Sequence, residues 1–352
     1  MTELKYLYGK PVAEAVFKAE PEDFIVNEIL GFEPEPNAAG QHHWLYIQKT
    51  GMNTEFLARK LADFANVQPR EVSFSGLKDR HAVTQQWFSV ELPAKTEVNW
   101  SHFEEPGAQI LEQVRSGRKL RRGTHQANEF SILLRSVTEP DLVNQRLSLI
   151  AQGVPNYFGP QRFGHEGRNI EKAKAMFAGR RVKDRNLRSL LLSAARSWLF
   201  NQIVDARLAA FGLEPVAGDA MQLQGSHSFF LADTIDDTVR ARLAEGDIAI
   251  TAPLPGRKKK SRDEIESSVE LSDAERFETE VLEPYQAWLD GLIRAGVEQH
   301  RRTLMLRPVD FEWNWEGEHL RLRFRLETGA FATSVLRELV QLKESSGAHF
   351  IE

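Results

Sequence analysis

The sequence of 352 residues contains no cysteine. A chain without thiols forms no disulfide and offers no thiolate ligand to a metal ion. Its ten histidines do not show zinc-site spacing either, because none forms an H-x-x-x-H or H-E-x-x-H pair. The adjacent His42 and His43 would point to opposite faces of a strand. We therefore expect no metal cofactor.

Long apolar runs are also absent. No stretch approaches the roughly 18 apolar residues that a membrane-spanning helix requires. The first ten residues, MTELKYLYGK, lack the apolar core of a secretion signal. We therefore expect a cytoplasmic protein that does not enter a membrane.

The chain has no excess of positive charge. Its 45 Lys and Arg against 50 Asp and Glu give a formal net charge of -5. This argues against a protein that coats nucleic acid indiscriminately, because phosphates are attracted by excess positive charge. Basic clusters nevertheless occur at 115–122, 180–188 and 257–262. Together they indicate a shaped site for a polyanion, although each could equally be a separate solvated face.

Apolar periodicity predicts that the first 152 residues mix strands and helices. The expected strands alternate apolar with polar residues and span 23–29, 43–48, 72–75, 83–90, 110–120 and 129–135. A helix capped by Asn53 or Thr54 is expected to run through Asn66. Pro140, whose missing N–H costs nothing at a helix start, opens a second helix that runs to Gly153.

Helices are expected to dominate the middle of the chain. Asp184 can cap a long helix that ends near Gly212. Another helical run spans 273–300 and should be split by Pro284. The segment 253–262, PLPGRKKKSR, is predicted to be an irregular loop because its prolines and glycine disfavour regular structure.

Strand signals return after Arg301. Alternating residues in 311–315 and 320–326, joined by a Glu-Gly turn, predict a hairpin with one buried face. A helix is expected from Thr328 or Gly329 through Leu342, with Phe331 in its first turn.

The order of these regions predicts an α+β protein with an insertion. The fifty or so residues after Arg301 are too few for a secure core of their own, so they should complete the first domain. We expect a discontinuous catalytic domain with a mixed, mainly antiparallel sheet at 1–152 plus 301–352, and a largely helical inserted domain at 153–300. A cleft between the two domains is the expected binding site.

One carboxylate stands out on the connection between two expected strands. Asp79 lies between Lys78 and Arg80, and Gly76 allows the chain to turn before it. The flanking cations favour the carboxylate anion, so the arrangement suits a nucleophile held over an anionic polymer. Charged residues between strands are also commonly solvated surface, and this pattern alone leaves both interpretations open.

The segment GLKDRHAVTQQ, residues 76–86, resembles the signature of the TruD family of tRNA pseudouridine synthases, G-x-K-D-[KR]-x-A-x-T-x-Q, at every fixed position. Four more segments resemble the family in the same order along almost the whole chain: PEDFIVNE (21–28), RKLRRGTHQANEF (118–130), GVPNYFGPQRFG (153–164) and GAFATSVLREL (329–339). Ala127 departs from the pattern, because relatives commonly have glycine there. If that glycine used a positive φ, Ala127 would alter the local backbone.

The resemblance implies an enzyme that isomerises uridine 13 of tRNA to pseudouridine. The reaction breaks the bond from N1 to C1′ and rejoins the base through C5, so no atom is gained or lost and no cofactor is implied. The catalytic aspartate of the family maps onto Asp79, which would attack the sugar carbon or assist proton removal there. Lys78 and Arg80 would favour its anion and contact phosphate. The implied partner is tRNA, and no obligate protein partner is inferred.

The target uridine must leave the RNA stack, and flipped bases are held by aromatic stacking and by hydrogen bonds. Similarity assigns such roles to Phe24, Asn128, Phe130 and Phe331, while Lys18 would reach a phosphate or the catalytic carboxylate. From the residues alone, Phe24 and Phe130 could instead be core aromatics, and Asn128 a turn residue. The inserted domain would be the part that distinguishes this family, with the clusters at 180–188 and 257–262 facing the tRNA.

Two other functional classes are left open. One is a catalytically silent RNA-binding protein that keeps the fold; the intact motif around Asp79 counts against it. The other is a carboxylate-dependent RNA hydrolase, which usually needs a second acid or base or a bound metal. No partner group for Asp79 can be assigned from the sequence, although His81 is close in the chain.

Overall fold

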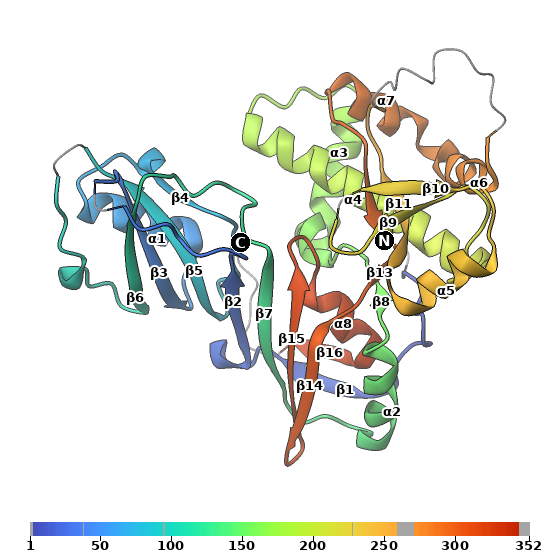
Figure 1. The fold of residues 1–352 in the computed structure, drawn as a ribbon, viewed down its shortest axis with the longest axis horizontal. Helices are drawn as coiled ribbons and strands as arrows, with labels where there is room; N and C mark the ends of the chain where they lie inside the picture. Colours follow the sequence, from blue (N-terminus) through green and yellow to red (C-terminus); the bar gives the residue numbers. More distant parts are fainter. Residues whose placement is uncertain (1–2, 38, 94–95, 227, 259–270, 345–352) are drawn as a thin grey trace. The chain divides into compact units, whose positions relative to one another are not determined.

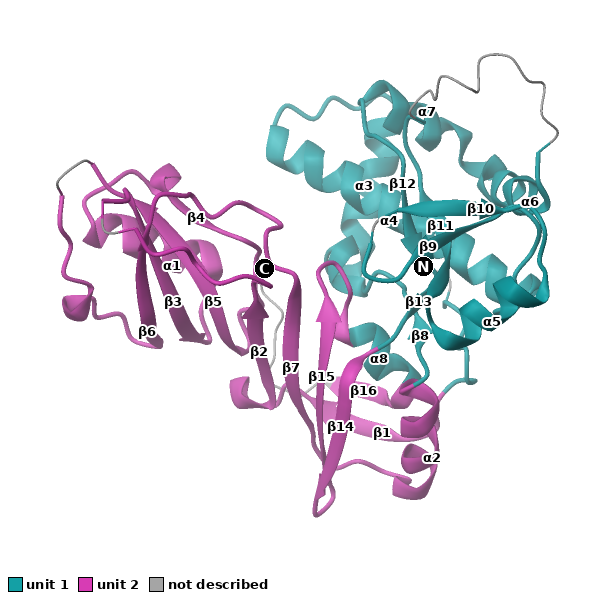
Figure 2. Ribbon diagram, viewed as in Figure 1, with its two compact units in different colours: residues 1–10, 152–307, 333–338 teal, residues 11–151, 308–332, 339–352 magenta. Residues whose placement is uncertain are grey.

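The computed structural model describes residues 3–37, 39–93, 96–226, 228–258 and 271–344. The chain divides into two compact units (Figure 2). Unit 1 comprises 1–10, 152–307 and 333–338, and unit 2 comprises 11–151, 308–332 and 339–352. Helices and strands are both abundant, which confirms the predicted α+β class. Most of the third basic cluster, from residue 259 onward, lies outside the described residues.

Unit 2 is built on an eight-stranded sheet. Across it the strands lie in the order β14 (Val309–Glu316), β15 (His319–Glu327), β7 (Ala127–Leu134), β2 (Phe24–Ile29), β5 (Val83–Glu91), β3 (His42–Thr50) and β6 (Ala108–Ser116), and β4 (Val72–Phe74) pairs with β5 beside this path (Figure 1). Within the described part of this sheet, β2 and β5 are the only strands that pair in parallel. The sheet is therefore mainly antiparallel, as predicted.

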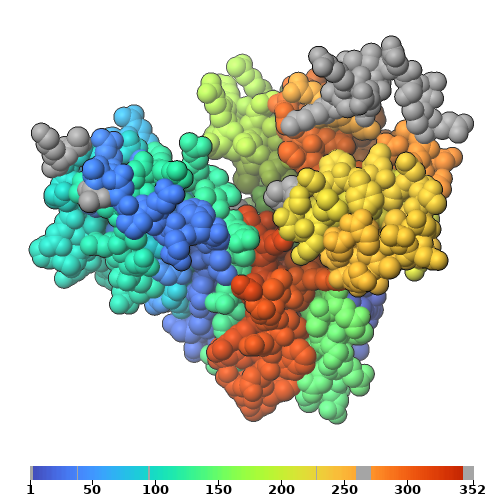
Figure 3. All heavy atoms as spheres, in the orientation of Figure 1, coloured from blue at the N-terminus to red at the C-terminus, as the bar shows by residue number. Residues whose placement is uncertain are grey.

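The hairpin of β14 and β15 follows the alternation in its sequence. The apolar positions of β15 are at most 1% exposed; they are Leu320, Leu322, Phe324 and Leu326. Among the alternate residues, Arg321 pairs with Glu316 and Arg325 with Asp310. β14 is the edge strand and much of it lies on the visible surface (Figure 3). Its acidic residues and the irregular register between Val309 and Glu312 discourage pairing with another chain.

A helix packs on the sheet of unit 2 where the sequence predicts one. In α1 (Thr54–Phe64), the side chain of Asn53 caps the N-terminus by accepting a backbone N–H bond of 2.8 Å. Leu57 and Leu61, one turn apart, share a buried cluster with Phe88 of β5. Unit 2 also contains α2 (Pro140–Ile150) and the 3₁₀ helices Pro21–Asp23, Pro69–Glu71 and Trp100–His102.

The last helix is shorter than predicted. α8 spans Ala332–Leu339, and the next residues form β16 (Gln341–Glu344), which pairs in parallel with β1 (Glu14–Phe17). The backbone N–H of Gln341 donates to the carbonyl of Ala13 at 2.8 Å. Strand pairing thus satisfies backbone groups that a longer helix would have satisfied internally, and the helix expected through Leu342 ends three residues early.

Unit 1 combines helices with a four-stranded sheet. Its helices are α3 (Arg168–Phe177), α4 (Arg185–Ala210), α5 (Asp237–Glu245), α6 (Asp273–Leu282) and α7 (Gln286–Arg294). The antiparallel sheet has the order β10 (Phe229–Ala232), β9 (Asp219–Leu223), β11 (Ile248–Leu254) and β12 (His300–Thr303), and β8 (Val154–Pro155) pairs with β13 (Met305–Leu306). Its 3₁₀ helices are Pro160–Phe163, His165–Gly167 and Glu283–Tyr285.

Two proline positions in unit 1 test the predictions. Pro284 separates α6 from α7 within a 3₁₀ turn, as expected. Pro253 was expected in an irregular loop, but it lies in β11 opposite Arg301 of β12. The pairing of β9 with β11 ends at Ile250, so no described strand pairs with Pro253 on that side. The missing N–H of Pro253 therefore removes no hydrogen bond between β9 and β11.

The chain changes unit after Ala151 and after Arg307. Residues 1–10 and 333–338 also belong to unit 1, although the sequence places them in the discontinuous domain. The division into a catalytic domain and an inserted domain stays a prediction, since compactness does not assign a role. Among the helices of the described residues, none has the length and apolar content to cross a bilayer.

Candidate active site

Asp79 lies on the connection between β4 and β5, as predicted, and its side chain is 52% exposed. The neighbouring Leu77 and Arg80 are also exposed. Within the described residues Arg80 forms no ion pair, so its guanidinium is available to an anion. The loop therefore presents one carboxylate and one cation to solvent.

Lys49 lies beneath this loop and was missed in the sequence. Its side chain is wholly buried, and Nζ donates to the carbonyl oxygens of Met52 at 2.7 Å and of Asp79 at 2.9 Å. Burial lowers the pKa of Lys49 to about 8, opposed by the negative charge of Asp79. A signal existed: Leu45, Ile47 and Lys49 occupy successive inward positions of β3, so the period of two places a lysine in the core.

A short chain of hydrogen bonds ties the first half of the loop to α1 and β5. The backbone N–H of Lys78 donates to Thr54 Oγ1 at 3.1 Å, and that hydroxyl donates to Gln86 Oε1 at 3.0 Å. Gln86 Nε2 in turn donates to the carbonyl of Gly76 at 3.0 Å. Thr54 and Gln86 are buried, so water does not compete for these bonds. Gln86, the last residue of the signature, thus has a structural role.

The side chain of Lys78 is directed into the protein. Its Nζ lies 2.7 Å from Glu28 Oε2, and the two side chains are 5% and 0% exposed. Glu28 also accepts hydrogen bonds from the Ser75 hydroxyl and from the Trp87 backbone N–H. The phosphate contact predicted for Lys78 therefore lacks support from this geometry, because its charge is already paired.

Lys18 contacts the side-chain carboxylate of Asp79. Its Nζ lies 3.1 Å from Asp79 Oδ2, which is one of the two contacts anticipated for it. The same ammonium lies 4.0 Å from the centre of the Phe24 ring, and its side chain is 8% exposed. Lys18 adopts φ of 55°, a left-handed conformation that is uncommon outside glycine. Packing around the ammonium thus holds one carboxylate oxygen of Asp79.

Phe24 and Phe130 lie on the neighbouring strands β2 and β7. Their ring centroids are 5.9 Å apart, and Phe130 stacks on Phe324 of β15 at 5.4 Å. Phe24 and Phe130 are 4% and 7% exposed. This burial agrees with the core interpretation of both aromatics, and the base contact inferred for them stays a prediction.

Asn128 and Phe331 belong to the same unit but have different surroundings. Asn128 is in β7, opposite Glu28 of β2 and Leu326 of β15. Its side-chain Oδ1 is buried and has no hydrogen-bond partner among the described residues. Phe331 is half-buried and immediately precedes α8, rather than lying in its first turn.

One expectation about the backbone, at Gly76, is corrected here, and the condition stated for Ala127 is not met. Gly76 does not need a positive φ; instead, an added Cβ would lie 3.1 Å from Cε1 of the buried His125. The close approach of His125 is what favours glycine. Burial, with help from the charge of Lys78, lowers the pKa of His125. Ala127 is an ordinary strand residue of β7, so the departure from the family pattern causes no strain.

The chain matches the family model described as tRNA pseudouridine synthase D (TruD) over residues 2–179 and 168–339. A tRNA pseudouridine synthase D from Aeromonas salmonicida is 48% identical over 347 residues, covering 98% of this chain and 96% of that protein. One from Pseudoalteromonas atlantica is 42% identical over 346 residues, covering 96% of each.

The structure resembles a solved structure described as tRNA pseudouridine synthase D (TruD) from Methanosarcina mazei. The TM-score is 0.69, at 22% sequence identity, and the match covers 96% of this chain and 95% of that one. At this identity the likeness shows a common fold, which is the α+β fold expected from the sequence.

Proposed function

This chain belongs to the TruD family of tRNA pseudouridine synthases, and we propose that it converts uridine 13 of tRNA to pseudouridine with Asp79 as the catalytic carboxylate. The observation that carries the proposal is that Asp79 is both accessible and held in place. Its carboxylate is half exposed, one oxygen is held 3.1 Å from Lys18 Nζ, and its backbone carbonyl is anchored by buried Lys49. A fixed carboxylate that a substrate can approach suits a nucleophile.

The reaction needs the uridine out of the RNA stack. In the proposed step, the Asp79 carboxylate attacks C1′ and forms an ester bond while the bond from C1′ to N1 breaks. The uracil then turns and C5 attacks C1′, which breaks the ester bond and returns the free carboxylate. The proton on C5 leaves, and N1 is protonated, so atoms balance without a cofactor. Removal of a sugar proton by the same carboxylate is the alternative route. Both routes need Asp79 as the anion.

Asn128 and Phe331 are the residues we assign to the flipped base. The unpartnered, buried Oδ1 of Asn128 is an acceptor, and the uracil N3–H is a donor that would satisfy it. Phe331 supplies a half-buried aromatic face on which a base can stack. Phe24 and Phe130 would support the site indirectly, because they form an aromatic layer of the sheet in which Phe24 packs against the ammonium of Lys18.

The exposed cation beside the carboxylate of Asp79 suits the proposed substrate, because tRNA carries a phosphate next to each nucleotide. Arg80 is solvated and lacks an ion pair within the described residues, so it is our candidate for a phosphate next to the target uridine. Lys78, paired with Glu28, instead supports the loop from within. This divides the two cations of the motif between binding and positioning.

Release of tritium from C5 of uridine tests the proposal. Purified wild type, Asp79→Asn and Asp63→Asn are incubated with a tRNA transcript labelled at C5; Asp63 is an exposed carboxylate on α1 and serves as the matched control. Wild type and Asp63→Asn should release tritium, and Asp79→Asn should not. A transcript with cytidine at position 13 should release none from that position.

The same assay separates the other classes. Bound and intact tRNA without release would support a silent RNA-binding protein, and strand cleavage would support a hydrolase. Release by Asp79→Asn at the wild-type rate would reject Asp79 as the catalytic group.

A further inference from the structure

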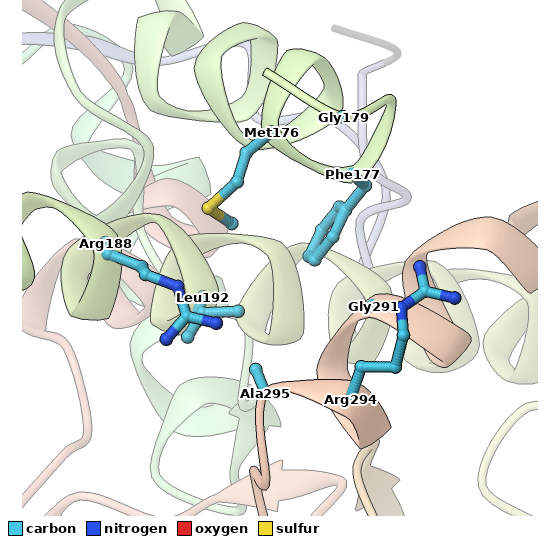
Figure 4. A pocket seen from close by; sticks show the side chains of 8 residues that line it. All are labelled: Met176, Phe177, Gly179, Arg188, Leu192, Gly291, Arg294 and Ala295. Carbon is cyan, nitrogen blue, oxygen red and sulfur yellow. The ribbon is translucent and has the colours of Figure 1, made fainter. Parts of the chain in front are cut away.

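Unit 1 contains a pocket for which the proposed reaction gives no use. It has a volume of about 240 Å³ and lies where α3 ends, beside the first turns of α4 and the end of α7. Figure 4 shows Met176 and Phe177 of α3 extending toward Leu192 of α4. Arg188 and Arg294 come in from α4 and α7 on opposite sides.

The part of the pocket wall formed by α3 is apolar and is supported by aromatic packing behind it. The Phe177 ring packs on Trp288 with centroids 5.7 Å apart, and Trp288 packs on Trp198 at 5.1 Å. A Cβ at Gly291 would lie 2.2 Å from the Phe177 ring, so the glycine is what lets α7 approach that ring. Met176 and Phe177 remain half exposed above this layer. A preformed, partly solvated apolar wall suits a flat ring that stacks on it.

The charges at the rim are uncompensated. Several arginines of unit 1 have acidic partners, as with Arg207 and Asp219 at 2.6 Å or Arg301 and Glu278 at 2.5 Å. By contrast, no described carboxylate lies within ion-pair distance of Arg188, and the same holds for Arg294; both side chains are exposed. Two unpaired guanidinium groups on opposite sides of one rim each attract an anionic group.

The adjoining surface extends this charge along the chain. The predicted cluster at 180–188 contains five cations and a single acid, Asp184. That acid is engaged, because its Oδ1 accepts from the backbone N–H groups of Asn186 and Leu187 at 2.8 and 3.1 Å. Arg188 of the pocket is therefore the last cation of a basic segment of the chain, and a run of cations fits a polymer of phosphates better than one isolated anion.

We propose that this pocket receives one unpaired nucleotide of the tRNA, with the base against Met176, Phe177 and Leu192 and with Arg188 and Arg294, on opposite sides, each contacting a phosphate of the RNA backbone. The inference rests on the proposed function, because it takes tRNA as the ligand. The volume is below the roughly 300–1,000 Å³ of pockets for drug-sized ligands, which suits a single base. The site belongs to unit 1, whereas Asp79 belongs to unit 2. None of its lining residues belongs to the loop that carries Asp79, so we expect the site to contribute to tRNA affinity and not to the chemical step.

Binding of a tRNA transcript across a salt series tests the two halves of the site separately. Arg188→Ala and Arg294→Ala should each raise Kd by about tenfold and reduce the slope of log K against log salt by about one. Leu192→Trp fills the pocket without changing charge, so it should raise Kd while leaving the slope unchanged. Arg240→Ala is the matched control, since Arg240 is an exposed arginine of unit 1 that pairs with Glu214.

A crosslink keeps the test informative if Leu192→Trp misfolds. With p-benzoylphenylalanine in place of Met176, illumination of the tRNA complex should join the protein to one nucleotide other than the target uridine. Crosslinks spread evenly along the RNA, or none to RNA, would overturn the inference, as would Kd and slope equal to those of Arg240→Ala for both arginine variants.

Tritium release by the same proteins separates this inference from the proposed function. The arginine variants should show a raised KM and an unchanged kcat. If wild type releases tritium and the pocket variants bind like the control, the pocket inference fails alone. If wild type releases none but the pocket variants lose tRNA affinity as described, the pocket stands as an RNA site and the proposed function fails.

Discussion

The ammonium of Lys49 donates a 2.9 Å hydrogen bond to the backbone carbonyl of Asp79, and it does so from a wholly buried side chain. Burying an ammonium group costs free energy unless its N–H groups make hydrogen bonds. Here a second N–H of Lys49 donates to the carbonyl of Met52. The bond fixes the backbone of the proposed catalytic residue, while Lys18 holds its carboxylate. Two lysines thus position Asp79 from opposite ends.

Replacing Lys49 with methionine should slow catalysis without weakening tRNA binding. Methionine fills similar space but leaves the carbonyls of Asp79 and Met52 without their donor, so the loop loses its anchor. Misplacement of a reacting group by about 1 Å can cost about a hundredfold in rate, and we expect kcat to fall by about ten- to a hundredfold. Single-turnover rates and Kd measure this; Lys49→Arg, which keeps the donors, should retain more activity. A kcat equal to that of wild type would show that the carbonyl needs no anchor.

Stability should depend on pH through the same residue. The pKa of Lys49 is about 8 in the folded protein against an ordinary 10.5, so between these values the unfolded chain binds more protons. The free energy of unfolding must then rise with pH over this window, because deprotonation removes a buried charge. Relative to Lys49→Met, wild type should gain up to about 3 kcal/mol between pH 8 and 10.5. Urea titrations of both proteins at several pH values measure the difference, which should be flat below pH 7.

The buried pair of Glu28 and Lys78 should behave as a unit. Glu28→Gln leaves the Lys78 ammonium buried without a counter-charge, and we expect a loss of about 3–5 kcal/mol in the free energy of unfolding. Adding Lys78→Met removes that charge, so the double variant should be more stable than Glu28→Gln alone. Denaturant unfolding of the four proteins in the cycle gives the coupling. Additive losses would mean that the pair is not coupled.

Local patterns predicted most of the fold because the chain obeys them consistently. The alternation of apolar residues in β15 predicts a strand, Asn53 predicts a helix start and Pro284 predicts a helix break, and each is observed. The helix expected through Leu342 failed for a nonlocal reason, since β1, more than 300 residues earlier, pairs with the residues that end it. Local propensity carries no information about such a partner.

The site shows the same limit at the level of side chains. The motif locates Asp79 but says nothing of the direction in which its neighbours point, so Lys78 was expected beside the substrate and is instead buried against Glu28. Gly76 was attributed to a turn, whereas the space it leaves is filled by His125, 49 residues later in the chain. Both depend on tertiary contacts that the signature does not record.

Phe24 and Phe331 allow packing and base recognition to be separated. Phe24 is 4% exposed and packs edge-on against Phe17 and at a tilt against Phe130, so Phe24→Ala should lower the free energy of unfolding by about 3–5 kcal/mol. Phe331 is half-buried, so Phe331→Ala should cost less stability but lower kcat/KM by about ten- to a hundredfold, because base stacking contributes about 1–3 kcal/mol. Phe331→Tyr keeps the ring and should restore most of the activity. Unfolding curves and tritium release on the same preparations measure both quantities. Phe331 would be assigned to packing if Phe331→Ala were destabilised as much as Phe24→Ala but still turned over tRNA at the normal rate.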